Sequence, residues 1–472
     1  MKELLKKLIP DFILYWYHWK LAFLGVLVYG FPSRKLKVIG VTGTKGKSTV
    51  VILAGKILNE AEKINPPQPP FTKGGRKTGW ISSLTINDGK KEIMNPYHMT
   101  MPGRFFIQKT LARMVKNGCQ YALVEVTSEG IKQHRHRFIK WAGAAFLNLA
   151  PEHLEAHGGF EKYRQAKEKL FAAAANNKES FGVYNLDDEN AEWFLEYPIN
   201  KKYGYSLDPS TNLKNNSPQP SLNIREGGEE IPPLNLRGGE GELNRFQISS
   251  IQLSANGSSF EIEDTKFKTN LLGEFNVYNC AAAAIIGQAC GVDLEIAARA
   301  LAKIKSIPGR LEIINEGQDF TVVVDLAHTP DSFEKVFALF KNLPHNKIIS
   351  VFGAAGGGRD KWKRPKLGKI ASQNSDQIFI TNEDPYNEDP LKIADDILAG
   401  CDKNKADIVL DRDEAIGRAL KMARTGDIVL VLGKGTEQTL VIGDKKYQWD
   451  DREAVREKLR GLISGTCAIK RR

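Results

Sequence analysis

The sequence has few cysteines and no pattern that would pair them. Five occur among 472 residues, which is an odd number. They are Cys119, Cys280, Cys290, Cys401 and Cys467. No two stand in a CxxC spacing, and no cleavable signal segment is evident. These absences argue against a disulfide framework and favour a reducing cytoplasm as the location of the protein.

The sequence also lacks an uninterrupted apolar run of the length that crosses a bilayer. Residues 12–31 are apolar and aromatic, but His18 and Lys20 interrupt them and Pro32 ends them. A spanning helix needs about 20 apolar residues, so we do not expect one here. Two interpretations stay open for residues 12–31: a helix lying on the membrane interface as a peripheral contact, or a helix packed on the domain or on a partner.

A central basic face is not evident, although the formal net charge is +11. Residues 1–40 carry seven Lys or Arg and two acids, and residues 470–472 add three further positive charges. Because the excess charge sits mostly at the chain ends, it argues against a nucleic-acid partner. The hydrophobic content of 42% and the charged content of 26% are ordinary for a soluble globular protein.

From Lys37 onward, short β-branched runs alternate with helical stretches. Each run leads into a Gly-rich or polar loop, as in KVIGVTG (37–43), YALVEVTS (121–128) and DIVLVLGKG (427–435). This arrangement predicts an α/β fold with parallel sheets and functional loops at the carboxyl ends of the strands. We expect an apolar helical segment at 1–35, a central P-loop parallel-sheet domain at 36–306 and a C-terminal Rossmann-like domain at 307–472.

Two segments depart from this alternation. Residues 65–77 and 215–242 are rich in Pro and Gly, and both contain a PQP sequence followed by apolar, basic and Gly-Gly residues. Such a composition buries little apolar surface. We therefore interpret both segments as exposed loops inserted into the central domain.

A Gly-rich loop follows the first predicted strand. Residues 40–49 read GVTGTKGKST, and their glycines let backbone N–H groups surround phosphate oxygens. Lys47 can reach the β- and γ-phosphates of a nucleotide, and Ser48 can bind Mg²⁺. The strict P-loop pattern has glycine where Val41 stands, but the strand, the Lys-Ser pair and the following apolar helix all agree. The nucleotide contacts that we predict in this loop are Gly43, Thr44, Gly46, Lys47, Ser48 and Thr49.

This loop resembles the TGT-x-GK-[ST] loop of the Mur ligase family, and similar segments follow in the family's order over residues 37–445. They include Glu125 and Ser128 after a strand, Gln-His-Arg at 133–135, residues 148–158, and Tyr-x-x-Ala-Lys at 163–167. The resemblance implies an ATP-dependent amide-bond-forming ligase that uses two magnesium ions. It also implies that Lys167 is carbamylated.

Three of these matching residues, Glu125, His153 and Lys167, differ in how well their side chains suit a magnesium site. Glu125 is a hard carboxylate ligand that suits Mg²⁺. His153 by itself is more typical of a loop histidine, and Lys167 by itself of a surface helix lysine. The resemblance makes His153 a metal ligand and Lys167 an anionic carbamate near the metal. Carbamylation requires a neutral amine, so the site must lower the pKa of Lys167.

Further segments of the resemblance concern the nucleotide. Residues 273–279 resemble Gly-x-Phe-Asn-x-x-Asn, which implies that Asn276 and Asn279 contact it, although Asn276 could instead cap a helix. Residues 308–312 resemble the family's hinge segment, which makes Arg310 a γ-phosphate contact in a cleft between the two domains. Asp325 and His328 stand in the next matching segment, and the resemblance makes Asp325 a nucleotide contact. The residues that we assign to catalysis are His328, Lys47, Lys167 and Arg310.

The C-terminal segments point to one branch of the family. Residues 325–332, 353–365 and 433–437 resemble the branch that adds the third amino acid to the muramoyl peptide, whereas folylpolyglutamate synthases usually have Ala-His-Asn-Pro in the first of them. The implied partners are an amino acid and a muramoyl-peptide-type acceptor. The residues that we assign to these substrates are Thr100, Pro102, Ser128, Arg135, Asp384, Tyr386, Gly433 and Glu437.

Two departures from the family affect the expected substrates. The usual N-terminal domain that holds a uridine nucleotide is missing, since only some 36 residues precede the first strand. The acceptor is therefore left open between UDP-linked, lipid-linked and γ-glutamyl polymer forms. Tyr386 stands where diaminopimelate-adding enzymes have arginine, so we expect another amino acid to be preferred. A non-catalytic nucleotide-binding subunit is the alternative to an enzyme, and the oligomeric state is open.

Overall fold

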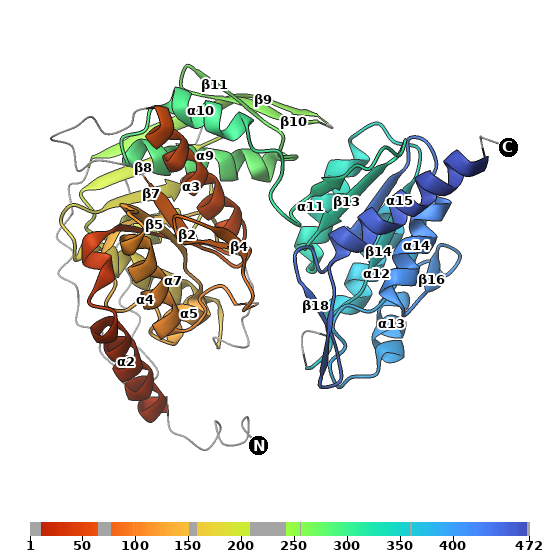
Figure 1. Cartoon of the computed structure of the whole chain (residues 1–472), viewed down its shortest axis with the longest axis horizontal. Helices are drawn as coiled ribbons and strands as arrows, with labels where there is room; N and C mark the ends of the chain where they lie inside the picture. Colours follow the sequence, from red (N-terminus) through yellow and green to blue (C-terminus); the bar gives the residue numbers. More distant parts are fainter. Residues whose placement is uncertain are drawn as a thin grey trace. The chain divides into compact units, whose positions relative to one another are not determined.

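The computed structural model describes residues 11–64, 77–97, 99–150, 158–207, 242–254, 256–358 and 361–469. The chain divides into two compact units, one formed mainly by residues up to Lys303 and the other mainly by residues from Ile304 onward (Figure 1). The predicted insertions lie outside the described residues except for Lys77 and Glu242. His153 also lies outside them.

An 11-stranded sheet forms the centre of the first unit, in the order β11-β10-β9-β8-β7-β6-β1-β5-β2-β3-β4. Its strands are β1 (Lys37–Thr42), β2 (Thr78–Ile81), β3 (Thr85–Asn87), β4 (Glu92–Met94), β5 (Tyr121–Glu125), β6 (Trp141–Phe146), β7 (Phe181–Asn185), β8 (Lys201–Ser206), β9 (Leu243–Ser254), β10 (Gly257–Ile262) and β11 (Thr265–Thr269). The strands from β2 to β9 in this order pair in parallel, whereas β3 and β4 at one edge and β10 and β11 at the other pair antiparallel. The loops that follow β1, β5 and β6 therefore emerge at the same edge of the sheet.

Helices cover both faces of this sheet. The helices of the first unit are α2 (Asp11–Val28), the 3₁₀ helix η1 (Pro32–Lys35), α3 (Lys47–Ile64), α4 (Arg104–Lys116), α5 (Ser128–Lys132), α7 (Phe160–Ala175), α8 (Ala191–Leu195), α9 (Glu274–Ala289) and α10 (Leu294–Ala302). Helices α3, α9 and α10 pack against one another. The buried side chains of α4, α5, α7 and α8 join a single cluster with the strands on the opposite face.

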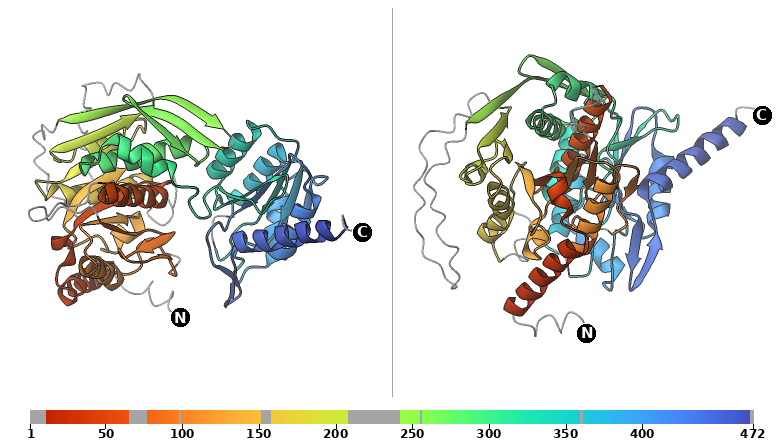
Figure 2. Two further views of the ribbon diagram at one scale, coloured as in Figure 1. Left: turned by 45° about the horizontal axis from the view of Figure 1, so that its top comes forward. Right: turned by 60° about the vertical axis from the view of Figure 1, so that its left-hand side comes forward.

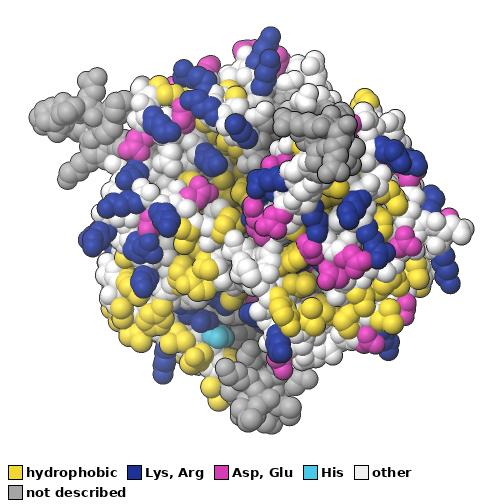
Figure 3. Space-filling view, turned by 45° about the vertical axis from the view of Figure 1, so that its right-hand side comes forward, with side chains coloured by type: hydrophobic (Ala, Val, Ile, Leu, Met, Phe, Trp, Pro, Cys, Tyr) yellow, Lys and Arg dark blue, Asp and Glu magenta, His cyan; other side chains and the backbone are white. Residues whose placement is uncertain are grey.

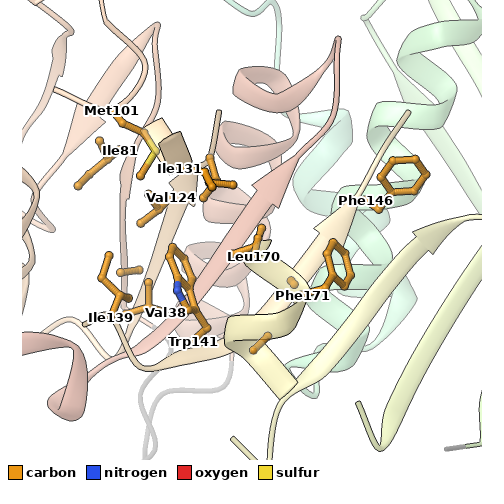
Figure 4. Close-up of a cluster of buried hydrophobic side chains, with 14 of the residues drawn as sticks. Val38, Ile81, Met101, Val124, Ile131, Ile139, Trp141, Phe146, Leu170 and Phe171 are labelled. Carbon is orange, nitrogen blue, oxygen red and sulfur yellow. The ribbon is translucent and has the colours of Figure 1, made fainter. Parts of the chain in front are cut away.

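That cluster is the main core on its face of the sheet (Figure 4). Val38 of β1, Val124 of β5 and Trp141 of β6 meet Leu170 and Phe171 of α7 there. Strand β1 is buried from its second residue to its end, as expected for a central parallel strand with helices on both faces. This burial explains why the strand reads as a nearly continuous apolar run.

The second unit contains a six-stranded sheet in the order β12-β13-β17-β14-β15-β16 and a small hairpin, β18-β19. Its strands are β12 (Glu312–Ile314), β13 (Thr321–Asp325), β14 (Ile348–Phe352), β15 (Gln377–Ile380), β16 (Ala406–Ile408), β17 (Ile428–Leu432), β18 (Thr439–Ile442) and β19 (Lys445–Gln448), and its helices are α11 (Pro330–Lys341), α12 (Lys363–Asn374), α13 (Pro390–Leu398), α14 (Arg412–Met422) and α15 (Asp451–Ile469). Helices α14 and α15 cover one face, while Phe333 of α11 packs on Phe352 at the other. The predicted α/β class, with a second parallel sheet toward the C-terminus, is confirmed.

Helix α2 forms from the apolar N-terminal segment and packs on α4 at the margin of the first unit (Figures 1 and 2). It is followed by Gly30 and Phe31 in left-handed backbone conformation and then by Pro32, which begins η1. Within the described part of the chain, no helix combines the length and the apolar character needed to cross a membrane. On the face shown in Figure 3, Lys and Arg side chains are interspersed with Asp and Glu, and hydrophobic side chains gather between them.

Candidate active site

The Gly-rich loop lies between β1 and α3, and hydrogen bonds from a neighbouring loop fix its shape. The backbone N–H groups of Thr44 and Lys45 donate to Asn148 Oδ1 at 3.1 and 2.8 Å, and Lys47 Nζ donates to the carbonyl of Thr44 at 2.8 Å. Gly46 has φ 81°, and the Asn279 side chain occupies the space that a Cβ would need there. Only glycine fits at this position, because both the backbone angle and the contact exclude a side chain.

Glu125 lies next to this loop at the end of β5, opposite Val41 of β1. Its Oε2 atom accepts hydrogen bonds from Ser48 Oγ at 2.8 Å and from the backbone N–H of Ser83 at 2.7 Å. The Oγ atoms of Ser48 and Ser83 are 2.7 Å apart. This group of one carboxylate and two hydroxyl oxygens, in which Glu125 and Ser48 are buried, fits Mg²⁺, which prefers hard oxygen ligands. The motifs did not indicate Ser83.

Lys167 of α7 is buried below the loop, with 2% of its surface exposed. Its Nζ donates to the carbonyl of Gly43 at 2.7 Å and lies 4.6 Å from the ring centroid of Tyr163. The Tyr163 hydroxyl in turn lies 3.1 Å from Thr44 Oγ1. The interpretation of Lys167 as a surface helix lysine is therefore wrong, because its side chain points into the phosphate-loop region.

Helix α9 brings Asn276 and Asn279 to the same loop. The helix begins at Glu274, so Asn276 lies inside the first turn and the interpretation of Asn276 as a cap is wrong. Its Oδ1 accepts a hydrogen bond from Asn279 Nδ2 at 3.0 Å, and both residues are buried. Thr49 is also buried, in the first turn of α3. The glycine loop, Glu125, Lys167 and both asparagines thus form one cluster in the first unit.

The predicted acceptor contacts of the first unit form a second cluster. Arg135 donates to the carbonyl of Met101, which lies between Thr100 and Pro102, and to Gln133 Oε1 at 2.6 Å. Ser128 is the first residue of α5, and a side chain at Gly130 in the same helix would collide with Met101. Burial lowers the pKa of Arg135, and its Nε has no hydrogen-bond partner among the described residues.

In the second unit, Asp325 fixes the segment that carries Arg310. Its two carboxylate oxygens accept hydrogen bonds from the backbone N–H groups of Leu311 at 2.8 Å and Ala327 at 2.7 Å. Burial raises the pKa of Asp325, and the nearby charge of Arg310 acts in the opposite direction. His328 Nδ1 lies 2.7 Å from the carbonyl of Leu326, before α11. Asp325 therefore joins the hinge segment to the end of β13.

The loops after β15 and β17 meet through Lys434, whose side chain is fully buried. Lys434 Nζ donates to Asp384 Oδ1 at 2.9 Å and to Glu437 Oε2 at 2.8 Å. Burial raises the pKa of Glu383 to about 7, and its Oε2 has no hydrogen-bond partner among the described residues. A side chain at Gly433 would collide with that oxygen. Sequence reasoning assigned Asp384, Gly433 and Glu437 to the site but not Lys434.

Tyr386 adopts left-handed backbone angles, with φ 50°, at the end of the same loop. Its N–H donates to the carbonyl of Val441 at 3.3 Å, and its ring lies against Gly357. The backbone of the β18 hairpin thereby fixes Tyr386 beside the loop that follows β14. Asp384, Tyr386, Gly433 and Glu437 belong to one cluster in the second unit.

A buried ion pair holds the loops after β15 and β17 in place. Arg412 donates from Nε and one terminal nitrogen to the two carboxylate oxygens of Asp451, each at 2.7 Å, and both side chains are fully buried. Arg412 also donates to the carbonyls of Asn382 at 3.1 Å and Leu432 at 2.9 Å. The pair therefore fixes the chain where it leaves β15 and β17.

Comparisons with known proteins cover both units. The family model of the Mur ligase middle domain matches residues 41–287, and that of the Mur ligase glutamate ligase domain matches residues 309–435. The UDP-N-acetylmuramyl-tripeptide synthetase of Borreliella afzelii is 36% identical over 442 residues, which cover 92% of this chain and 79% of that protein. The UDP-N-acetylmuramoyl-L-alanyl-D-glutamate--2,6-diaminopimelate ligase of Syntrophomonas wolfei is 33% identical over 450 residues, covering 94% and 82%. A solved structure of a ligase with the same name aligns with TM-score 0.57 at 27% identity, over 91% of this chain and 79% of that one.

Proposed function

The chain belongs to the Mur ligase family and is an ATP-dependent, ADP-forming amide ligase of peptidoglycan synthesis, and we propose that it adds an amino acid to a muramoyl-peptide-type acceptor. The observation that supports this most directly is the group formed by Glu125, Ser48 and Ser83 beside the Gly-rich loop. That group unites a nucleotide-phosphate loop with a hard-oxygen site for Mg²⁺. These are the parts that phosphoryl transfer to a carboxylate requires.

In the proposed reaction, the acceptor carboxylate attacks the γ-phosphorus of ATP and forms an acyl phosphate, releasing ADP. The amine of the incoming amino acid then attacks the acyl carbon, and inorganic phosphate leaves. Lys47 and Arg310 would stabilise the negative charge on the transferred phosphoryl group. Two magnesium ions, held by Ser48, Glu125, His153 and modified Lys167, would supply further neutralisation of that charge.

The test of this proposal is a panel of acceptors. Phosphate release is measured with ATP and candidate amino acids against UDP-linked, lipid-linked and γ-glutamyl polymer acceptors. The proposal requires amino-acid-dependent release with a muramoyl-peptide acceptor and formation of the amide product. If the protein binds the nucleotide but releases no phosphate with any of these acceptors, the alternative of a non-catalytic subunit is favoured.

We further propose that Lys167 is carbamylated in the working enzyme. Its position supports this, because the side chain is buried, with 2% of its surface exposed, and its Nζ lies next to the Gly-rich loop and not in solvent. The carbonyl of Gly43 and the ring of Tyr163 hold Nζ beside the phosphate loop. A carbamate formed there would carry its negative charge toward the proposed metal group.

We expect the Lys167→Ala variant to be inactive and to regain part of its ligation rate when short-chain carboxylates are added. An added carboxylate can occupy the space of the missing side chain and replace its anionic group. Lys169→Ala serves as the matched control, because Lys169 lies on the same helix but is not assigned to the site. A wild-type crystal with unmodified Lys167 far from any metal would contradict the proposal.

Deletion of residues 66–76 or 217–241 is expected to leave ligation and stability nearly unchanged. Their composition predicts surface insertions, for which shortening alters mainly the loop entropy, by about 0.6 kcal/mol per doubling of length. Steady-state ligation rates and thermal unfolding of the two deletion variants check this. A large loss of activity in either would show that the segment belongs to a site.

A further inference from the structure

One side of α2 exposes large apolar side chains at helical spacing. Six of them are between 47% and 59% exposed, and exposed Lys20 lies among them. This outward stripe consists of Ile13, Trp16, Tyr17, Lys20, Leu24, Leu27 and Val28. Its members are three or four residues apart along most of the helix, so they lie on one side. A contiguous apolar stripe of this kind usually marks an interaction surface.

The opposite side of α2 is fixed to the body of the first unit. Ala22 and Val26 are buried, and the Cβ position of Gly25 lies 3.7 Å from the backbone of α4. The Tyr15 ring stands edge-on to His134, with ring centroids 4.4 Å apart. A terminal nitrogen of Arg104 lies 2.5 Å from His18 Nδ1. Because these contacts orient the helix, its outward stripe faces away from the unit as a defined surface.

The charges around the stripe are basic. The sequence has no Asp or Glu between Asp11 and Glu60. Arg34 and Lys35 are exposed just after the helix. An apolar stripe that contains Lys20 and is followed by these two basic residues complements a surface that has an apolar interior and an anionic headgroup layer.

We propose that the outward stripe of α2 docks on the surface of an anionic lipid bilayer, with the helix lying in the plane of the interface. Trp16 and Tyr17 suit the headgroup level, where amphipathic aromatic rings concentrate. Leu24, Leu27 and Val28 would enter the acyl boundary, while Lys20 would extend toward anionic headgroups.

The position of Lys20 favours lipid over a second copy of this chain. In a symmetric helix pair through the same stripe, Lys20 would be buried without an acidic partner, because this stretch of α2 has none. Burying an unpaired charge is strongly unfavourable, whereas a lysine at a bilayer surface keeps its charge in the headgroup layer.

Docking in this way would also orient the proposed acceptor cluster. Arg104 contacts His18 of α2 and donates from Nε to the carbonyl of Gln133 at 3.0 Å. The side chain of Gln133 in turn accepts a hydrogen bond from Arg135 at 2.6 Å. Helix α2 is thus linked to a residue assigned to the acceptor by three contacts, through Arg104 and Gln133, which suits an acceptor present at the membrane.

The test is sedimentation of the full chain with vesicles of phosphatidylcholine, with or without phosphatidylglycerol. We expect binding to the anionic vesicles and about a hundredfold weaker binding for the Leu24→Glu/Leu27→Glu variant, since two leucines lose their burial. Lys20→Glu should weaken binding about tenfold or more on anionic vesicles and little on neutral ones. The matched control is Leu391→Glu/Met422→Glu, which changes equally exposed apolar residues of the second unit.

Thermal unfolding verifies that each variant is folded, and sedimentation velocity without vesicles reports the oligomeric state. The proposal is overturned if the wild type does not bind vesicles, if the stripe variant binds as well as the control, or if the stripe variant changes only the oligomeric state. Vesicle binding is measured without substrates, so its failure is distinguishable from failure of the ligase proposal.

Discussion

Lys47→Ala and Glu125→Ala are each expected to lower the ligation rate about 100-fold or more, because each removes a group that stabilises the transferred phosphoryl charge. Lys47 begins α3 at the end of the Gly-rich loop. Glu125 accepts hydrogen bonds from Ser48 and from the N–H of Ser83 in the proposed metal group. Steady-state phosphate release and amide formation with saturating ATP measure the effect.

The controls separate chemistry from folding. Lys56→Ala changes another lysine of α3, and Glu92→Ala an exposed carboxylate of β4. Because Glu125→Ala leaves the Ser83 N–H without its acceptor, Glu125→Gln is added; it keeps an oxygen there but removes the charge. Near wild-type turnover in folded Lys47→Ala or Glu125→Gln would contradict the site assignment.

Lysine or ornithine, rather than meso-diaminopimelate, is the amino acid that we expect this enzyme to prefer. Diaminopimelate carries a second carboxylate at the end of its side chain, and burying it without a cation costs several kcal/mol. At 1.4 kcal/mol per tenfold, a cost of about 3 kcal/mol corresponds to roughly a hundredfold discrimination. Tyr386 offers one hydroxyl where a guanidinium would bind that carboxylate with two hydrogen bonds.

Besides Lys363, residues 361–364 contain two cations that could replace the guanidinium, and both are already paired. Lys361 Nζ lies 3.0 Å from Glu388 Oε1. Arg364 is fully buried and binds both Glu388 and Asp396, and these hydrogen bonds with Arg364 and Lys361 lower the pKa of Glu388 to about 2. Buried Glu383, by contrast, offers a carboxylate oxygen that suits a distal ammonium.

The measurement compares kcat/KM for diaminopimelate, lysine, ornithine and alanine with one acceptor. The pKa of Glu383 is raised to about 7, so its carboxylate is protonated below that pH and charged above it. The ratio of kcat/KM for lysine to that for alanine should therefore rise as the pH passes from 6 to 8, about one unit on either side of that pKa. In Glu383→Gln the ratio should be lower and independent of pH.

Tyr386→Arg supplies the converse test, since it should raise kcat/KM for diaminopimelate relative to lysine. Tyr386→Phe is its matched control, because it removes the hydroxyl without adding charge. A clear preference of the wild type for diaminopimelate would refute the prediction and would direct attention to the cations of residues 361–364.

The parts of the site that are local in sequence were accessible to sequence reasoning. The Gly-rich loop follows the buried parallel strand β1, Glu125 ends the buried parallel strand β5, and pairing of β1 with β5 brings them together. The place of Ser83 depends on β2 pairing with β5, and no motif marks that contact. Arg412 and Asp451 likewise begin two helices distant in sequence, so only the packing of α14 on α15 joins them. The burial of Lys167 could be recognised only from the fold, since nothing in the Lys-Glu-Lys sequence of residues 167–169 indicates it.

The buried pair of Arg412 and Asp451 has an evolutionary consequence. Loss of either partner leaves a charge in the core, at a cost of about 3–5 kcal/mol, whereas replacement of both by apolar residues of similar volume can be neutral. Single changes at these positions would therefore be eliminated by selection, and the two codons would change only in concert. A substitution of Arg412 alone would also remove the hydrogen bonds to the carbonyls of Asn382 and Leu432, which hold the chain after β15 and at the end of β17. Helix α15 and the loops after β15 and β17, to which we assign the amino-acid site, would therefore be expected to change together.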